Sequence, residues 1–176
     1  MVTDNYRLQL LLKSVWQYAL EETQYTTAIR STPIGQQSDD IRWRAKVQKD
    51  SGQIEASCRL YEEALRLHGA DDDSAAAAGA RHDLAETLTD RHLGLHVENL
   101  LRAQVLYRRA QRSTERERNP SRSAMTRASL ASCLRGLAGM PMVDAKHERK
   151  LLDEAQELLR EAIRIDERRG PAGLPA

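Results

Sequence analysis

The sequence predicts an all-α protein built from three tandem helix pairs. Leu and Ala dominate the apolar residues, Phe is absent, and only five Pro and nine Gly occur in 176 residues, so helix propensity is high almost throughout. One spacing pattern, which we call the repeat frame, occurs three times: a small residue, then Tyr or Leu four positions later, then Ala three positions after that. Each copy follows a helix-like segment centred on an Ala. The frames are Ser57, Tyr61 and Ala64; Ala103, Tyr107 and Ala110; and Ala155, Leu159 and Ala162, and the preceding segments centre on Ala45, Ala85 and Ala131. Such repetition is typical of repeat proteins.

A capping helix is predicted for residues 1–24, with Thr3 or Asp4 as its N-cap. Its apolar residues fall on one helical face, and they are Leu8, Leu11, Leu12, Val15, Trp16, Ala19 and Leu20. This segment lacks the repeat frame, so we expect it to cover the exposed end of the first pair. Residues 25–37 contain several Thr and Ser with Pro33 and Gly35, and they are interpreted as a linker.

The helix pairs are predicted over residues 38–70, 74–116 and 121–169. In the first pair, Ser38 or Asp39 caps a helix that ends near Asp50, and a turn at Ser51 and Gly52 leads to a helix from Gln53 to about His68. The second pair is predicted at about Ser74–Asp90 and Glu98–Arg116, and the third at about Arg122–Leu137 and Asp144–Arg169. Residues 170–176, rich in Gly and Pro, are expected to be a disordered tail.

The first pair resembles the tetratricopeptide repeat (TPR). Ala45, Gly52, Ser57, Tyr61 and Ala64 stand at the mutual spacings of that family, which carries small residues where its two helices cross. The physical reason is visible without the family, because Ala45 and Ser57 let two backbones approach closely. The resemblance implies a right-handed α-solenoid of antiparallel helix pairs.

The second and third units are related by a constant shift, which maps Arg81, Leu84 and Ala85 onto Arg127, Leu130 and Ala131. This longer unit is similar to the extended TPRs found beside CHAT-type caspase-like protease domains in bacteria. The likeness is carried by Leu84-Ala85, Asp90-Arg91, Glu98-Asn99-Leu100, Ala103, Tyr107-Arg108-Arg109-Ala110 and Ser123-Ala124-Met125-Thr126. It implies a scaffold or adaptor in a bacterial signalling or defence system.

Composition favours a chain with mixed surface charge. The net charge is +1 with 30% charged residues, which argues against an obligate nucleic-acid or membrane binder. No run of 18 apolar residues and no leader-like amino end occur, so we expect a cytoplasmic location. Cys58 and Cys133 are expected to be reduced and buried, since two cysteines form no disulfide framework.

The resemblance implies that the first helix of each pair lines a concave groove, and the expected function is non-catalytic recognition of a protein or peptide there. Residues that flank the crossing Ala on this face are the candidate contacts. They are Arg42, Lys46 and Lys49 in the first pair, His82, Glu86 and Thr89 in the second, and Met125, Ser132 and Arg135 in the third. A groove edged by Arg42, Lys46, Lys49 and Arg135 would suit an acidic or carboxylate-ended peptide.

An Arg-rich stretch supports the alternative of a nucleic-acid-binding helical protein. The run comprises Arg102, Arg108, Arg109, Arg112, Arg116, Arg118, Arg122 and Arg127. Glu115 and Glu117 interrupt it, aromatic residues are not interleaved with it, and helical spacing spreads it around the axis. Nucleic-acid binding is therefore the less favoured prediction.

Catalysis and cofactors have no motif in the sequence. His92 and His96 are four apart, but Gly94 between them favours a turn and no further ligand completes a metal site. No nucleophile elbow, phosphate-binding loop or dinucleotide fingerprint appears. The chain is thus expected not to be an enzyme and to bind no metal or cofactor. Trp16 and Trp43 are interpreted as core residues, because large aromatics mainly supply buried area.

The last predicted helix carries a wide apolar stripe with no further helix to cover its outer side. The stripe includes Leu152, Leu159 and Ile163. Either the chain is a fragment of a longer protein, or this end face contacts a partner or a second copy in a homodimer.

Overall fold

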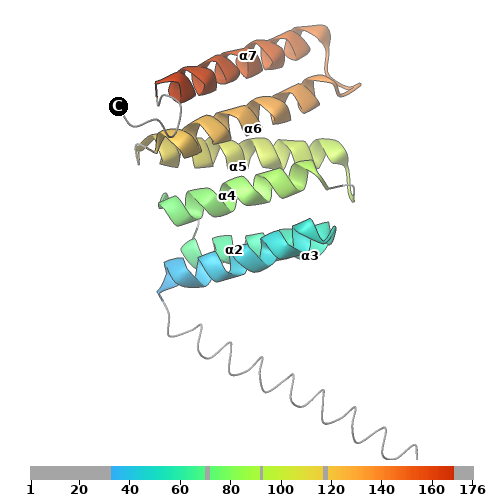
Figure 1. The fold of residues 1–176 in the computed structure, drawn as a ribbon. Coiled ribbons are helices and arrows are strands. Elements are labelled where there is room, and N and C mark those ends of the chain that lie inside the picture. The colour runs from blue at the N-terminus through green and yellow to red at the C-terminus, as the bar shows by residue number, and fades with distance from the viewer. Residues whose placement is uncertain (1–32, 70–71, 92, 117–118, 169–176) are drawn as a thin grey trace, which may run out of the picture. The chain divides into compact units, whose positions relative to one another are not determined.

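The computed structural model describes residues 33–69, 72–91, 93–116 and 119–168, which contain helices and no strand (Figure 1). This confirms the all-α prediction. The helices are α2 (Ile34–Asp50), α3 (Ile54–His68), α4 (Ala75–Thr89), α5 (His96–Arg116), α6 (Pro120–Ala138) and α7 (Ala145–Glu167). The chain divides into two units, residues 1–37 and 38–176, and of the first unit only the start of α2 is described. The predicted capping helix, the linker up to residue 32 and the tail lie outside the described residues.

Side chains cap three of the helices where the sequence predicts starts or close to them. Ser74 Oγ accepts from the backbone N–H of Ala77 at the start of α4, and Asn119 Oδ1 accepts from that of Arg122 at the start of α6. Asp144 Oδ1 accepts two backbone N–H groups at the start of α7, each at 2.9 Å. Polar caps of this kind satisfy N–H groups that have no partner within the helix.

Two helices, α2 and α5, begin earlier than predicted and without a side-chain cap, and α6 starts at Pro120 and not at about Arg122. The carbonyl of Pro33 accepts the N–H of Gln37 at 3.1 Å, so α2 starts at Ile34 and Ser38 is a buried residue inside the helix, not its cap. The carbonyl of Leu95 accepts the N–H groups of Glu98 and Asn99, so α5 starts at His96. Pro33 and Leu95, which supply these carbonyls, have no side-chain oxygen that could cap a helix, so neither start carries the Ser, Thr, Asp or Asn signal.

The repeat frame forms the core. Consecutive helices from α3 to α7 pack side by side, and α4 also contacts α6 (Figure 1). Ala45, Ala85 and Ala131, predicted at helix crossings, have no exposed surface. Tyr61 and Tyr107 are buried with them in one apolar cluster, as predicted. A smaller cluster joins α2 to α3 and α4 through Ile41, Ala64 and Ala80.

Trp43 is not a core residue. Its side chain is 68% exposed, whereas Ile41 and Ala45 on either side of it are buried. A residue two positions from each of these lies on the opposite side of an α-helix, so packing of Ile41 and Ala45 turns Trp43 outward. Trp16, for which the sequence predicts the same packing, lies outside the described residues.

Both cysteines are buried free thiols, as predicted. Of the helices in the described part of the chain, none has the length and apolarity needed to cross a membrane.

Candidate functional site

A cleft of about 550 Å³ lies between α4 and α6, with α5 beneath it; we call it the α4–α6 cleft. Small residues of α6 border the cleft. A Cβ added at Gly136 would contact Leu100 of α5, whose Cδ1 lies 3.4 Å from the ideal Cβ position, and would take up part of the cleft. Its lining residues are Glu86, Thr89 and Asp90 from α4 and the residue after it, His96, Leu100 and Tyr107 from α5, and Ala128, Ser129, Ser132, Cys133 and Gly136 from α6.

The floor of the cleft is tightly packed. Tyr107 is almost fully buried, and its ring meets the edge of the His82 ring at a centroid distance of 5.4 Å. The Cys133 thiol donates to the carbonyl of Leu100 at 3.3 Å, and burial raises the pKa of this thiol to about 11. Burial likewise raises the pKa of the Tyr107 hydroxyl above its usual range. The floor therefore carries neutral groups at physiological pH.

One wall of the cleft carries two carboxylates that share a single cation. Lys49 Nζ of α2 lies 3.0 Å from Glu86 Oε2 and 3.0 Å from Asp90 Oδ2. Burial lowers the pKa of Lys49, but its hydrogen bonds to Glu86 and Asp90 more than offset this, and the pKa lies above its ordinary value. The opposite wall offers the hydroxyls of Ser129 and Ser132. The two walls thus differ in charge and hydrogen-bonding character.

The three basic residues of α2 that the sequence places at the groove edge are all paired. Arg42 donates to Asp83 Oδ2 at 2.7 Å and to Asp39 Oδ1 at 3.0 Å, and Lys46 lies 3.1 Å from Asp50. Together with the Lys49 contacts, five carboxylates meet three cations on α2 and α4 and the residue after α4. This cluster therefore has a net negative charge, and the pairing opposes a positively charged edge at Arg42, Lys46 and Lys49.

The other predicted groove residues fall in three places. Glu86 and Thr89 line the α4–α6 cleft, and Thr89 Oγ1 donates to the carbonyl of Glu86 at 2.7 Å. His82 does not line it, because its ring is buried and lies 3.2 Å from Thr126 Oγ1 of α6. Arg135 lies in a second cleft of about 590 Å³ between α6 and α7, with Glu148 and Leu152; we call it the α6–α7 cleft, and it shares Ser132 and Gly136 with the α4–α6 cleft.

Sequence reasoning missed most of the cleft's floor and its α6 wall. It predicts Tyr107 as a core residue and Cys133 as a buried thiol, although each also faces the cleft. It predicts Ser132 as a groove residue but not Ser129 or Gly136. The available signal was the run of small residues at 128, 129, 132 and 136, which share one helical face.

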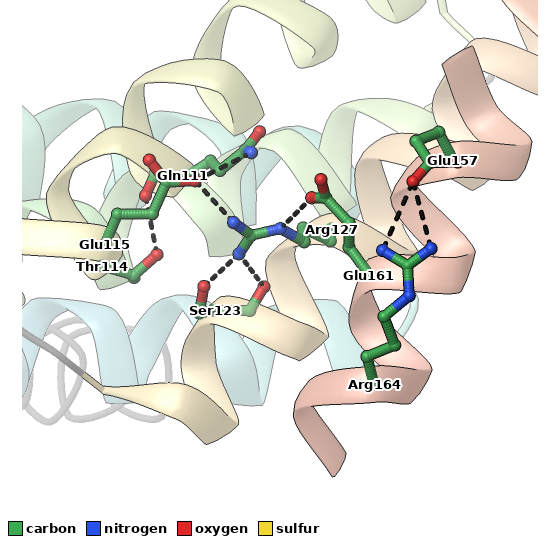
Figure 2. Close-up of polar contacts among 8 residues, drawn as sticks. All are labelled: Gln111, Thr114, Glu115, Ser123, Arg127, Glu157, Glu161 and Arg164. Carbon is green, nitrogen blue, oxygen red and sulfur yellow. Dashed lines mark hydrogen bonds and ion pairs between the residues drawn. The ribbon is translucent and has the colours of Figure 1, made fainter. Parts of the chain in front are cut away.

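Several members of the Arg-rich stretch are engaged with acidic or backbone groups of other helices. Arg102 pairs with Glu62 at 2.9 Å, Arg108 pairs with Glu154 at 2.8 Å, and Arg122 donates to the carbonyl of Ala75. Figure 2 shows Arg127 of α6 between Glu115 of α5 and Glu161 of α7, at 2.6 and 2.8 Å. These contacts use the arginines to join helices, which disfavours a phosphate-binding surface made from them.

His92 lies outside the described residues, and His96 is exposed at one end of the α4–α6 cleft. Across the described ranges, no three His, Cys, Asp or Glu side chains are grouped so that they could hold a metal ion.

The end face on α7 keeps two of its three named residues exposed. Leu152 is 41% and Ile163 57% exposed, while Leu159 packs partly against the main core cluster.

Comparisons with known proteins assign no family. No family model matches the chain, and no curated protein matches it. Among solved structures, the crystal structure of BtubC (BKLC) from P. vanneervenii is similar, with 14% sequence identity over 93% of this chain and 79% of that chain and a TM-score of 0.44. A TM-score of this size is below the level that indicates a shared fold.

Proposed function

We propose that this chain is a non-catalytic protein-interaction module, a TPR-like right-handed α-solenoid of three helix pairs, which binds an extended segment of a partner protein in the α4–α6 cleft. The observation that carries the proposal is the cleft itself. It combines an apolar and aromatic floor with polar groups on both walls, which is the usual composition of a recognition site.

The two walls fit different parts of a bound peptide. Ser129 and Ser132 can donate to or accept from the peptide main chain, because a hydroxyl does both. Leu100 and Tyr107 offer apolar contact at the floor. A volume of about 550 Å³ suits one or two peptide side chains, with the rest of the segment lying along the α4 and α6 surfaces.

Charge favours a partner with a basic side chain at this point. Lys49 contacts Glu86 and Asp90, yet the side chains of these two residues are 54% and 52% exposed, so both carboxylates are accessible to a partner. A Lys or Arg of the partner would balance the net negative charge with charge-assisted hydrogen bonds. An acidic peptide, the expectation from the sequence, is less favoured because Arg42, Lys46 and Lys49 already have carboxylate partners.

The proposal is tested with three immobilised peptide libraries that differ only in a fixed central residue: Arg, Ser or Glu. The full chain should bind the Arg library best, and Ser132→Trp, which fills the cleft from an exposed position on α6, should abolish that binding. Lys150→Trp, exposed on α7 and outside the cleft, is the matched control and should bind normally. Equal binding by Ser132→Trp, or no binding to any library, would contradict the proposal.

A further inference from the structure

One side of α7 carries a regular seam that the core leaves largely uncovered. Its positions advance in alternating steps of three and four, the spacing of a two-helix coiled-coil contact. We call it the α7 seam, and its residues are Arg149, Leu152, Gln156, Leu159, Ile163 and Asp166. Leu159 is partly buried and the other five are exposed. The seam is apolar or uncharged in the middle, positive at one end and negative at the other.

We infer that the α7 seam is the contact surface of a symmetric dimer, in which α7 of one copy packs antiparallel against α7 of a second copy. A single register then matches every position. Arg149 faces Asp166 of the second copy, Leu152 faces its Ile163, and Gln156 faces its Leu159. Two-fold symmetry repeats each pair, because an isologous interface uses the same patch on both subunits.

Charge decides the direction and supplies the argument for a second copy as the occupant. In a parallel pair, Arg149 would face Arg149 and Asp166 would face Asp166, which is repulsive at both ends. In the antiparallel pair both ends are attractive. In the same register, Asp153 and Arg160, exposed on the flank of the seam, come within two residues of the same level in opposite copies. Within its own helix, Arg160 makes an exposed contact with Glu157 at 3.3 Å.

The neighbouring surface leaves room for this partner. The α6–α7 cleft runs beside the Leu152 end of the seam and is lined on the α6 side by the small residues Ser132, Gly136 and Gly139. Arg135 in that cleft lies near the level at which Asp166 of the second copy arrives. The inference therefore adds a role at the dimer contact for Arg135, which the sequence predicts at the peptide groove. The inference does not depend on the α4–α6 cleft binding a peptide.

The test uses the full chain and measures molar mass by light scattering across a dilution series. A dimer that dissociates on dilution is expected. Arg149→Glu and Asp166→Arg should each weaken it by about tenfold, since either change places like charges together at both symmetric contacts. Lys150→Glu makes the same kind of charge change as Arg149→Glu but lies off the seam, and it should leave the dimer unchanged.

Charge reversal in trans identifies the register. When Arg149→Glu and Asp166→Arg are mixed, the two substituted positions face each other with opposite charges at one contact. At the other contact the native Arg149 of the second variant faces the native Asp166 of the first, so a mixed dimer should recover. Circular dichroism checks that each variant is folded. A chain that is monomeric at every concentration would overturn the inference and leave the seam to a different protein. A dimer insensitive to both variants, or no recovery in the mixture, would overturn the antiparallel seam.

Discussion

Nε of Arg127 donates to Oε2 of Glu161 across 2.8 Å, joining α6 to α7. The same guanidinium donates through Nη2 to Oε1 of Glu115 at 2.6 Å, and through Nη1 to the hydroxyl and carbonyl of Ser123 (Figure 2). The Arg127 side chain is only 11% exposed, so these partners take the place of water around the guanidinium. One buried cation therefore ties three consecutive helices together.

Arg127→Met should lower the free energy of unfolding by about 1–3 kcal/mol. Methionine keeps much of the packing but leaves Glu115 and Glu161 near each other without their shared cation. Both carboxylates are over one-third exposed, so solvent screens them and we expect a loss near the lower end of this range. Urea denaturation measures it.

The matched control is Arg164→Met on α7. Arg164 is 55% exposed and its contact with Glu157 is 3.4 Å, so the same substitution should change stability by less than about 0.5 kcal/mol. Equal effects of the two substitutions would show that burial of the Arg127 network is not what stabilises the fold.

Stability should fall as the pH drops below about 6.5. In the unfolded chain a histidine takes up a proton near that pH. Burial lowers the pKa of folded His82, aided by the charges of Arg122 and Arg42 and opposed by those of Asp83 and Glu86. The unfolded chain then binds more protons than the folded chain, and the free energy of unfolding falls with decreasing pH. Denaturation at a series of pH values measures the slope.

His82→Gln removes the titrating ring and retains a polar group that can reach Thr126. This variant should lose the part of the slope below pH 6.5 that His82 contributes, although its stability at neutral pH is lower. An unchanged slope in the variant would assign the pH dependence to other groups.

Ala131→Leu should destabilise the protein by about 1–3 kcal/mol, because overpacking forces neighbouring side chains from their preferred rotamers. Ala131 has no exposed surface and lies in the main core cluster. Ala75→Leu, at an exposed position in the first turn of α4, should be nearly neutral. An unaffected melting temperature for Ala131→Leu would mean that the helices do not approach closely at this residue.

Cys133 should react slowly with iodoacetamide in the folded protein at pH 8. Its thiol is buried, and burial raises its pKa to about 11, so little reactive thiolate is present. Cys58 is buried too, and burial also raises its pKa. Mass spectrometry should show alkylation of both only after urea is added. Modification of Cys133 in native buffer at the rate of the unfolded chain would show that the cleft floor opens.

Core positions could be predicted from the sequence because their constraint is one of volume. A small residue at Ala45, Ala85 or Ala131 is needed wherever two helices cross, and that need recurs with the repeat. His82 shares one helical face with Glu86 and Thr89, as its spacing predicts, but at its level along α4 that face is covered. Its ring lies 5.4 Å from the Tyr107 ring and 3.2 Å from Thr126 Oγ1 of α6. Residue spacing gives the face of a helix but not which part of that face a neighbouring helix covers.

The charge of the groove could not be predicted for a different reason. Arg42 and Asp83 are far apart in the chain, and their contact depends on the distance between α2 and α4. Residue types alone count cations and carboxylates but do not show which of them are neutralised. The α4–α6 cleft was also missed because it depends on how the helices are spaced. Its volume lies over Gly136, which has no side chain, and over the small residues near it.

The Arg127 contacts limit how this chain can be re-engineered. In α4 the corresponding Arg81 donates to the carbonyl of Asp72, in the link before its own helix. That hydrogen bond would be kept if the link and α4 were moved together. Arg127 instead draws one carboxylate from the helix before it and one from the helix after it. A graft of α6 and α7 onto another helical array must therefore include Glu115 of α5. A consensus repeat, averaged over the three units, would not retain the Glu115–Arg127–Glu161 contacts.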